Sequence, residues 1–153
     1  MKTVILALII ILLSGCAKGR LDVYNSDGEI VGECIAQYDW HLYGVKDSVN
    51  YLLNICAQQA HKEGNHIKDE VILNTDFTLP SPPDGKKWNK LIAMQQFKNG
   101  DLSEQKLGYI LSAIEYEYAL KEWAAEAQLA EGEITQDEFD KLIKEAKYIW
   151  YGR

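Results

Sequence analysis

Residues 38–44 are the one stretch of the chain whose side-chain types and spacing could do chemistry. The stretch reads Tyr-Asp-Trp-His-Leu-Tyr-Gly. Asp39 and His41 could orient a general base, and the aromatic rings could stack on a sugar or a peptide. No nucleophile in a recognisable context accompanies them, so we predict no catalytic residue and no enzyme. The rings either cover a small core or form a binding surface. The candidate binding residues are Tyr38, Trp40, His41 and Tyr43.

Groups that could hold an ion are poorly arranged for it. His61 and His66 lie five residues apart near the expected end of a helix, where solvated side chains are the simpler interpretation. A calcium loop over residues 23–34 would begin with valine and end with cysteine, and neither can ligate calcium in that role. We therefore predict no metal and no cofactor.

The amino-terminal stretch predicts export and a lipid anchor. Lys2 precedes the apolar run Val4–Leu13, which is too short to span a bilayer and is typical of a signal peptide. The run ends in Leu-Ser-Gly-Cys, residues 13–16. This tetrapeptide resembles the lipobox of bacterial lipoproteins. The resemblance implies a signal peptide over residues 1–15, diacylglycerol on the Cys16 thiol, and a further acyl chain such as palmitate on the new amine.

The residues after Cys16 bear on where such a lipoprotein resides. Ala17 and Lys18 occupy positions where an aspartate retains lipoproteins of the enteric type in the inner membrane. The resemblance thus points to the outer membrane, with the chain facing the periplasm and residues 16–20 serving as a short polar tether. An ordinary secretory signal with an incidental cysteine is the competing interpretation.

Cys34 and Cys56 are left as a pair once Cys16 carries lipid. An exported chain meets an oxidising compartment, so we predict a disulfide between them. A loop of this length would gain about 3 kcal/mol from the bridge. A metal pair or a redox pair is the alternative, but the spacing is not Cys-x-x-Cys and no second ligand pair lies nearby.

Charge excludes one class of partner. The chain has 23 acidic and 16 basic side chains and a net charge of −7 at pH 7, and loss of Lys2 with the signal makes it one unit more negative. No cluster of lysine and arginine reverses the charge locally, so we expect no nucleic-acid partner.

The first part of the mature chain reads as a small α/β unit over residues 21–77. Two strand-like runs flank an Asp-Gly turn at residues 25–28, which is a strong hairpin signal. Asp47 and Ser48 are the expected cap of a helix whose apolar residues recur at helical spacing as far as Gly64. Residues 67–73 read as a third strand. The expected order is ββαβ, with the disulfide joining the helix to the sheet.

The second part reads as helical. Residues 78–85 contain all three prolines of the chain and predict a stiff linker. In residues 86–153 we expect three helices, Lys86–Lys98, one ending near Ala130 and one ending near Tyr151, forming two helical hairpins. The predicted fold class is therefore α+β.

The two breaks in the helical part form an internal repeat. Gly, an acid, Leu or Ile, and Ser or Thr occur at residues 100–103 and again at 132–135. Thr135 and Glu138 predict a capping box. Residues 132–142 resemble the short SHOCT module, whose signature is Gly-x-Ile-Thr-x-x-Glu-Phe. The resemblance implies a two-helix hairpin that mediates assembly and not catalysis.

The long expected helix has two apolar faces and so needs two partners. Its second stripe gives the candidate interaction residues Tyr116, Leu120 and Trp123. Packing within the chain explains this stripe as well as a protein partner does.

These patterns favour a membrane-anchored, periplasm-facing lipoprotein that acts as a non-catalytic protein-interaction or assembly factor of the cell envelope. The alternative is a binding module that holds a cell-wall fragment, or an incoming phage or toxin protein, through residues 38–44.

Overall fold

The computed structural model describes residues 17–38 and 43–152, so Cys16, Trp40 and His41 lie outside the described residues. The fold is α+β, as predicted: a two-stranded antiparallel sheet accompanied by helices. The elements are β1 (Ala17–Tyr24), β2 (Ile30–Tyr38), α1 (Val45–Lys62), α2 (Glu70–Asn74), the 3-10 turn η1 (Pro83–Gly85), α3 (Lys90–Lys98), α4 (Glu104–Ala130) and α5 (Gln136–Tyr151).

The predicted hairpin is confirmed. β1 and β2 pair antiparallel, with Ala17 opposite Tyr38 at one end and Tyr24 opposite Ile30 at the other. Asn25 fixes the turn because its side-chain oxygen accepts hydrogen bonds from the backbone N–H groups of Asp27 and Glu29. The polar tether predicted for residues 16–20 is wrong over its described part, since the pairing in β1 starts at Ala17.

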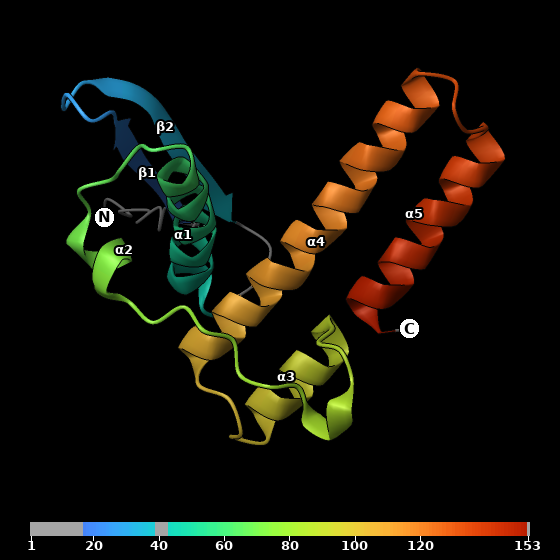
Figure 1. Cartoon of the computed structure of the whole chain (residues 1–153). Helices are drawn as coiled ribbons and strands as arrows, with labels where there is room; N and C mark the ends of the chain where they lie inside the picture. The colour runs from blue at the N-terminus through green and yellow to red at the C-terminus, as the bar shows by residue number, and fades with distance from the viewer. Residues whose placement is uncertain (1–16, 39–42, 153) are drawn as a thin grey trace, which may run out of the picture.

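One face of the hairpin is covered by α1 (Figure 1). Gly19 lets the two layers approach, because a Cβ atom there would lie 2.6 Å from Leu53 and 2.7 Å from Val49. The predicted disulfide is confirmed and joins Cys34 of β2 to Cys56 of α1, with Cα atoms 5.9 Å apart. The buried core of this unit consists of Leu21, Val23, Cys34, Ala36, Tyr38, Val49, Leu53, Ala60, Ile67 and Ile72.

The third strand predicted for residues 67–73 is wrong. Glu70–Asn74 form the short helix α2, because the Asp69 carboxylate accepts a hydrogen bond from the N–H of Ile72 and caps the helix. Among the described residues, a single isolated backbone bridge, between Tyr24 and His66, lies along the outer edge of β1.

Two helix starts also differ from the prediction. α1 begins at Val45 and not at Asp47, because Gly44 adopts a left-handed conformation (φ 64°) and donates its N–H to a carboxylate oxygen of Glu104 at 2.8 Å. α3 begins at Lys90 and not at Lys86, because the Asn89 side chain accepts from the N–H of Ile92.

The three helices of the second part and its two helical hairpins are confirmed. Gly100 and Gly132 are left-handed (φ 84° and 74°) and follow the carboxyl ends of α3 and α4. The predicted capping box is present at the start of α5, where Thr135 and Glu138 exchange hydrogen bonds.

A close crossing of α1 and α4 connects the two parts of the chain. A Cβ atom on Gly108 would lie 2.5 Å from the carbonyl oxygen of Gly44, so only glycine fits there. The fully buried Ser48 hydroxyl donates to the Gly108 carbonyl oxygen at 3.0 Å. From this crossing α4 runs away from the hairpin and α1, so that the molecule has two arms (Figure 1).

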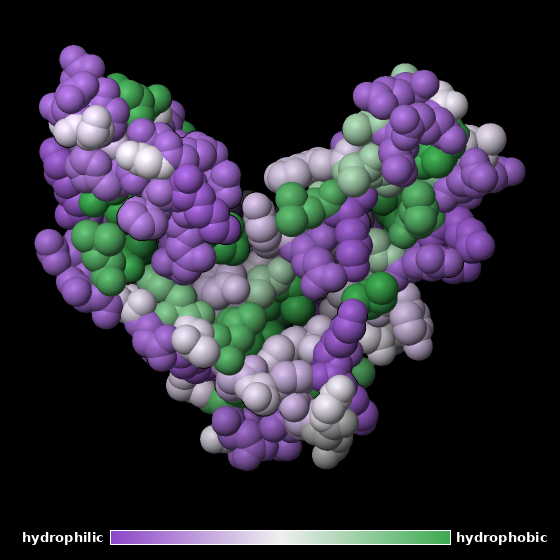
Figure 2. Space-filling view, in the orientation of Figure 1, coloured by the Kyte–Doolittle hydropathy of each residue, from purple (hydrophilic) through white to green (hydrophobic). Residues whose placement is uncertain are grey.

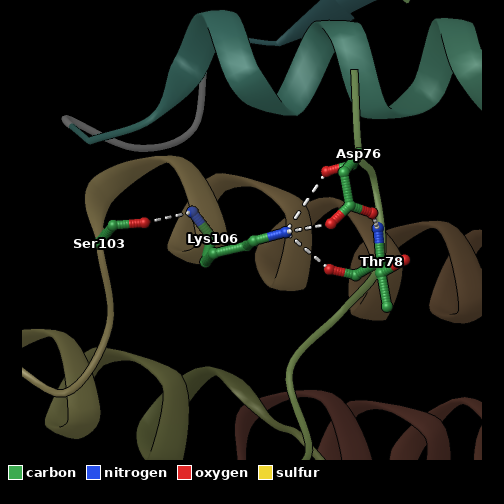
Figure 3. A network of polar contacts seen from close by, with 4 residues as sticks. All are labelled: Asp76, Thr78, Ser103 and Lys106. Carbon is green, nitrogen blue, oxygen red and sulfur yellow. Dashed lines mark hydrogen bonds and ion pairs between the residues drawn. The ribbon is translucent and has the colours of Figure 1, made fainter. Parts of the chain in front are cut away.

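A lysine fastens the segment between α2 and α3 to α4. The Nζ atom of Lys106 donates to the carbonyl oxygens of Thr78 at 2.8 Å and Asp76 at 3.3 Å, and lies 3.9 Å from the Asp76 carboxylate (Figure 3). The backbone N–H of the same residue donates to the Ser103 hydroxyl, which caps α4.

Candidate functional site

A groove lies between the two arms of the molecule. It encloses about 610 Å³ between β2, α1 and the middle of α4, and Figure 2 shows the surface hollowed between the arms, with hydrophobic side chains at the base. Its apolar lining includes Val31 and Ile35 of β2, Leu52 and Ile55 of α1, and Tyr116 and Trp123 of α4.

The groove continues into a second hollow of about 330 Å³ beside α5. The two hollows are contiguous because they share four lining residues, Gln37, Leu52, Tyr116 and Trp123. We call the combined space the β2–α4 groove.

Polar atoms without partners lie at the inner end of the β2–α4 groove. The Ser112 hydroxyl, the Oε1 atom of Glu115 and the indole N–H of Trp150 are buried and make no hydrogen bond among the described residues. All three residues line the second hollow. Because unpaired buried polar groups are costly, such groups indicate a place where a ligand could supply the missing bonds.

The environment of Glu115 favours its neutral form. Burial raises the pKa of this carboxyl to about 7. Close to neutral pH the side chain can therefore donate a hydrogen bond when protonated, or accept one and attract a cation when ionised.

The residues predicted for interaction fall partly in the groove. Tyr116 and Trp123 line both hollows, and Trp123 is 58% exposed. Leu120 is 45% exposed on the same helix but does not line either hollow.

The candidate binding residues of segment 38–44 do not form one surface among the described residues. Tyr38 is buried in the core, and it also lines the second hollow. Tyr43 packs against Phe97 of α3, with ring centroids 5.1 Å apart. Trp40 and His41 lie outside the described residues, as does Cys16.

Sequence reasoning missed Ser112, Glu115 and Trp150. The available signal was a serine and a glutamate three residues apart in the otherwise apolar run of residues 107–116. Only the fold shows that α5 brings Trp150 to the same place.

Metal binding finds no geometric support in residues 17–38 and 43–152, where no three His, Cys, Asp or Glu residues form a group that could hold an ion. His66 instead exchanges two backbone hydrogen bonds with Tyr24. Within these same residues, no helix combines the length and the apolar character needed to cross a membrane.

No protein-family model matches the chain, and no characterised protein or solved structure matches it either.

Proposed function

We propose that this chain is a lipid-anchored protein of the bacterial cell envelope that faces the periplasm and works by holding another protein, without catalysis. The observation that carries the proposal is the β2–α4 groove. Trp123 forms part of its wall and remains 58% exposed, so the elements that the structure describes leave this aromatic surface uncovered. Exposed aromatic side chains beside an apolar groove are typical of protein-binding surfaces.

The Leu-Ser-Gly-Cys motif and the disulfide support the envelope location. The motif ends at Cys16, the residue before β1. The Cys34–Cys56 bridge suits an oxidising compartment. The outer membrane is the proposed site, because Ala17 and Lys18 follow the cysteine.

Mass spectrometry of the protein made in a Gram-negative host tests the anchor. We expect an acylated amino-terminal cysteine and recovery with the outer membrane. A Cys16→Ala variant should lose the lipid mass and leave the membrane fraction. A bare amino terminus on the unaltered protein would overturn the anchor.

Site-specific photo-crosslinking in intact cells tests the protein-binding role. A photoreactive phenylalanine analogue at Trp123 should crosslink to a second protein. The control is the same analogue at Lys121, which pairs with Glu117 on the exposed surface of α4 outside the groove. Equal crosslinking from both positions, or none from either, would contradict the proposal.

The alternative of a cell-wall or phage ligand held by residues 38–44 has less support. Tyr38 is only 5% exposed, and Tyr43 packs on Phe97. A Trp40→Ala variant with unaltered crosslinking from Trp123 would leave the groove as the binding surface.

A further inference from the structure

The outer edge of β2 is an open strand edge. Within the described residues the sheet has two strands, and β1 covers one edge of β2. The edge of β1 is partly closed by the Tyr24–His66 bridge, whereas no described strand lies along the other edge of β2. Backbone N–H and C=O groups along such an edge are ready to pair with another chain.

The β2–α4 groove runs along this open edge. Ile35, Ala36 and Gln37 are consecutive residues, and all three line the groove. Successive side chains of a strand point to opposite faces of the sheet, so a hollow that touches all three reaches the edge of the strand.

The backbones of β2 and α4, which border the groove, are set apart. No Cα atom of β2 lies within 8 Å of a Cα atom of α4. A neighbouring strand would lie about 4.8 Å from β2 in the hydrogen-bonding direction. Its side chains would then meet Leu52 of α1 on one side and the rings of Tyr116 and Trp123 of α4 on the other.

The negative charge of the groove favours an occupant that carries a positive charge. The ionisable carboxylates that line it are Glu33, Glu63 and Glu115, and no lysine or arginine of the described chain lines it. Arg20 already pairs with Glu33 at 2.8 Å. Glu115, in contrast, keeps one carboxylate oxygen without a hydrogen bond among the described residues.

We propose that an extended segment of another envelope protein adds to the free edge of β2 as a third strand, with alternating apolar side chains and a lysine or arginine that pairs with Glu115. Main-chain hydrogen bonds to the strand edge supply affinity in this mode, and side-chain pockets supply specificity. The inference rests on the proposed function, because it states how the groove holds its partner.

A library of random ten-residue peptides displayed on phage provides the probe. The protein, as the cell processes it and purified in detergent, should select peptides with alternating apolar residues and one lysine or arginine. A fluorescent copy of the best peptide is then N-methylated at one backbone position at a time. Strand addition predicts that methylation weakens binding at every second position only, since alternate N–H groups face β2.

Matched variants test the charge pairing. Glu115→Gln keeps the size of the side chain and should weaken binding of the lysine-containing peptide about tenfold. Replacing that lysine by norleucine should remove the difference between the two proteins. Glu117→Gln, on the same helix outside the groove, should bind as the unaltered protein does, and circular dichroism verifies that both variants are folded.

The outcomes separate this inference from the proposed function. Failure to select a peptide, a methylation scan without a two-residue period, equal binding by Glu115→Gln, or a second copy of this chain as the occupant would each overturn strand addition. If Trp123 nevertheless crosslinks to another protein in cells, the protein-binding role stands and only its mode is wrong. If crosslinking also fails, both are wrong.

Discussion

Glu115 is a partly buried carboxyl whose ionisation is shifted by its surroundings. Burial raises its pKa to about 7, so the folded state holds the proton more tightly than the unfolded state does. The linkage has a definite sign. Stability is unaffected by this group below the unfolded pKa near 4.5, falls as the pH rises towards 7, and stays lower above that.

A Glu115→Gln variant should therefore be more stable than the unaltered protein at pH 8 and equally stable near pH 4. The expected gain at pH 8 is roughly 1 kcal/mol, after allowance for solvent screening of a carboxyl that is partly exposed. Urea unfolding of both proteins at the two pH values measures it. A gain of the same size at both would show that the effect is not ionisation.

Gly108 is the residue that sets the distance between α1 and α4. Replacing a glycine by alanine inside a helix normally adds about 1 kcal/mol of stability. Here the new Cβ would lie 2.5 Å from the Gly44 carbonyl oxygen, so we expect Gly108→Ala to lose about 1–3 kcal/mol instead.

Thermal unfolding followed by circular dichroism measures this loss. Gly32→Ala is a matched control, because a Cβ atom there meets only Val23 at an ordinary 3.9 Å. The control should stay within about 0.5 kcal/mol of the unaltered protein. Stabilisation by Gly108→Ala would mean that the helix crossing is looser than described.

At the scale of elements, the disulfide connects the two-stranded sheet to helix α1, which covers it. The sheet is too small to be stable alone. Two-stranded hairpins are marginal in water without a packed partner. The bridge closes a loop with a sequence separation of 22 residues. Replacing Cys34 and Cys56 together by alanine should cost about 3 kcal/mol, measured by urea unfolding. Reduction of the unaltered protein should reproduce the loss, and an unchanged unfolding midpoint in either case would contradict it.

The segment between α2 and α3 depends on Lys106. Its ammonium group donates to two carbonyl oxygens of that segment, and the lysine side chain is only 28% exposed (Figure 3). Lys106→Met keeps the aliphatic stem and removes the bonds, so we expect a loss of about 1–2 kcal/mol and faster hydrogen exchange at residues 76–80. Lys121→Met, which breaks only an exposed pair with Glu117, should cost less than about 0.5 kcal/mol.

Sequence patterns predicted the helical part well because its determinants are local. Gly100, Gly132 and the Thr135 cap act within one turn of the helices that they end or begin. Lys106 is instructive, because it occupies the place where a capping box would need a glutamate. The fold uses this lysine for a contact 28 residues away, which no local pattern could predict.

One error in the predicted fold arose from contacts with distant residues, and another from a local helix cap. Gly19 was predicted to be part of a tether because a glycine gives no sign in the sequence that its strand position faces inward. The side chains of Val49 and Leu53, which pack against it, account for the glycine. Residues 67–73 looked like a strand because they end in the apolar run Val71-Ile72-Leu73, but the Asp69 cap favoured a helix. In the candidate site, the apolar stripe predicted Tyr116 and Trp123, while Glu115 gains its role from burial that the sequence does not display.

At the scale of the whole molecule, the position of β1 matters for the proposed anchor. Strand pairing starts at Ala17, directly after the residue proposed to carry lipid. A flexible insertion of twelve Gly and Ser residues between Cys16 and Ala17 should leave the unfolding midpoint unchanged, because it breaks no strand pair. It would let the fold move about 20 Å from the bilayer. We expect a lower yield of crosslinking from Trp123 in cells, and an unchanged yield would show that the partner is indifferent to that distance.

The start of β1 also limits how a partner can enter. Ala17 pairs with Tyr38, so the inner end of the groove, beside Gln37 and Glu115, lies within a few residues of the proposed acyl chains. The other end, beside Val31, is about 20 Å farther along β2. Lipid headgroups would hinder a globular domain from reaching the inner end of the groove. A flexible terminal segment, or a membrane-tethered stalk, could still enter. We therefore expect the segment that reaches Glu115 at the inner end of the β2–α4 groove to be a free chain terminus.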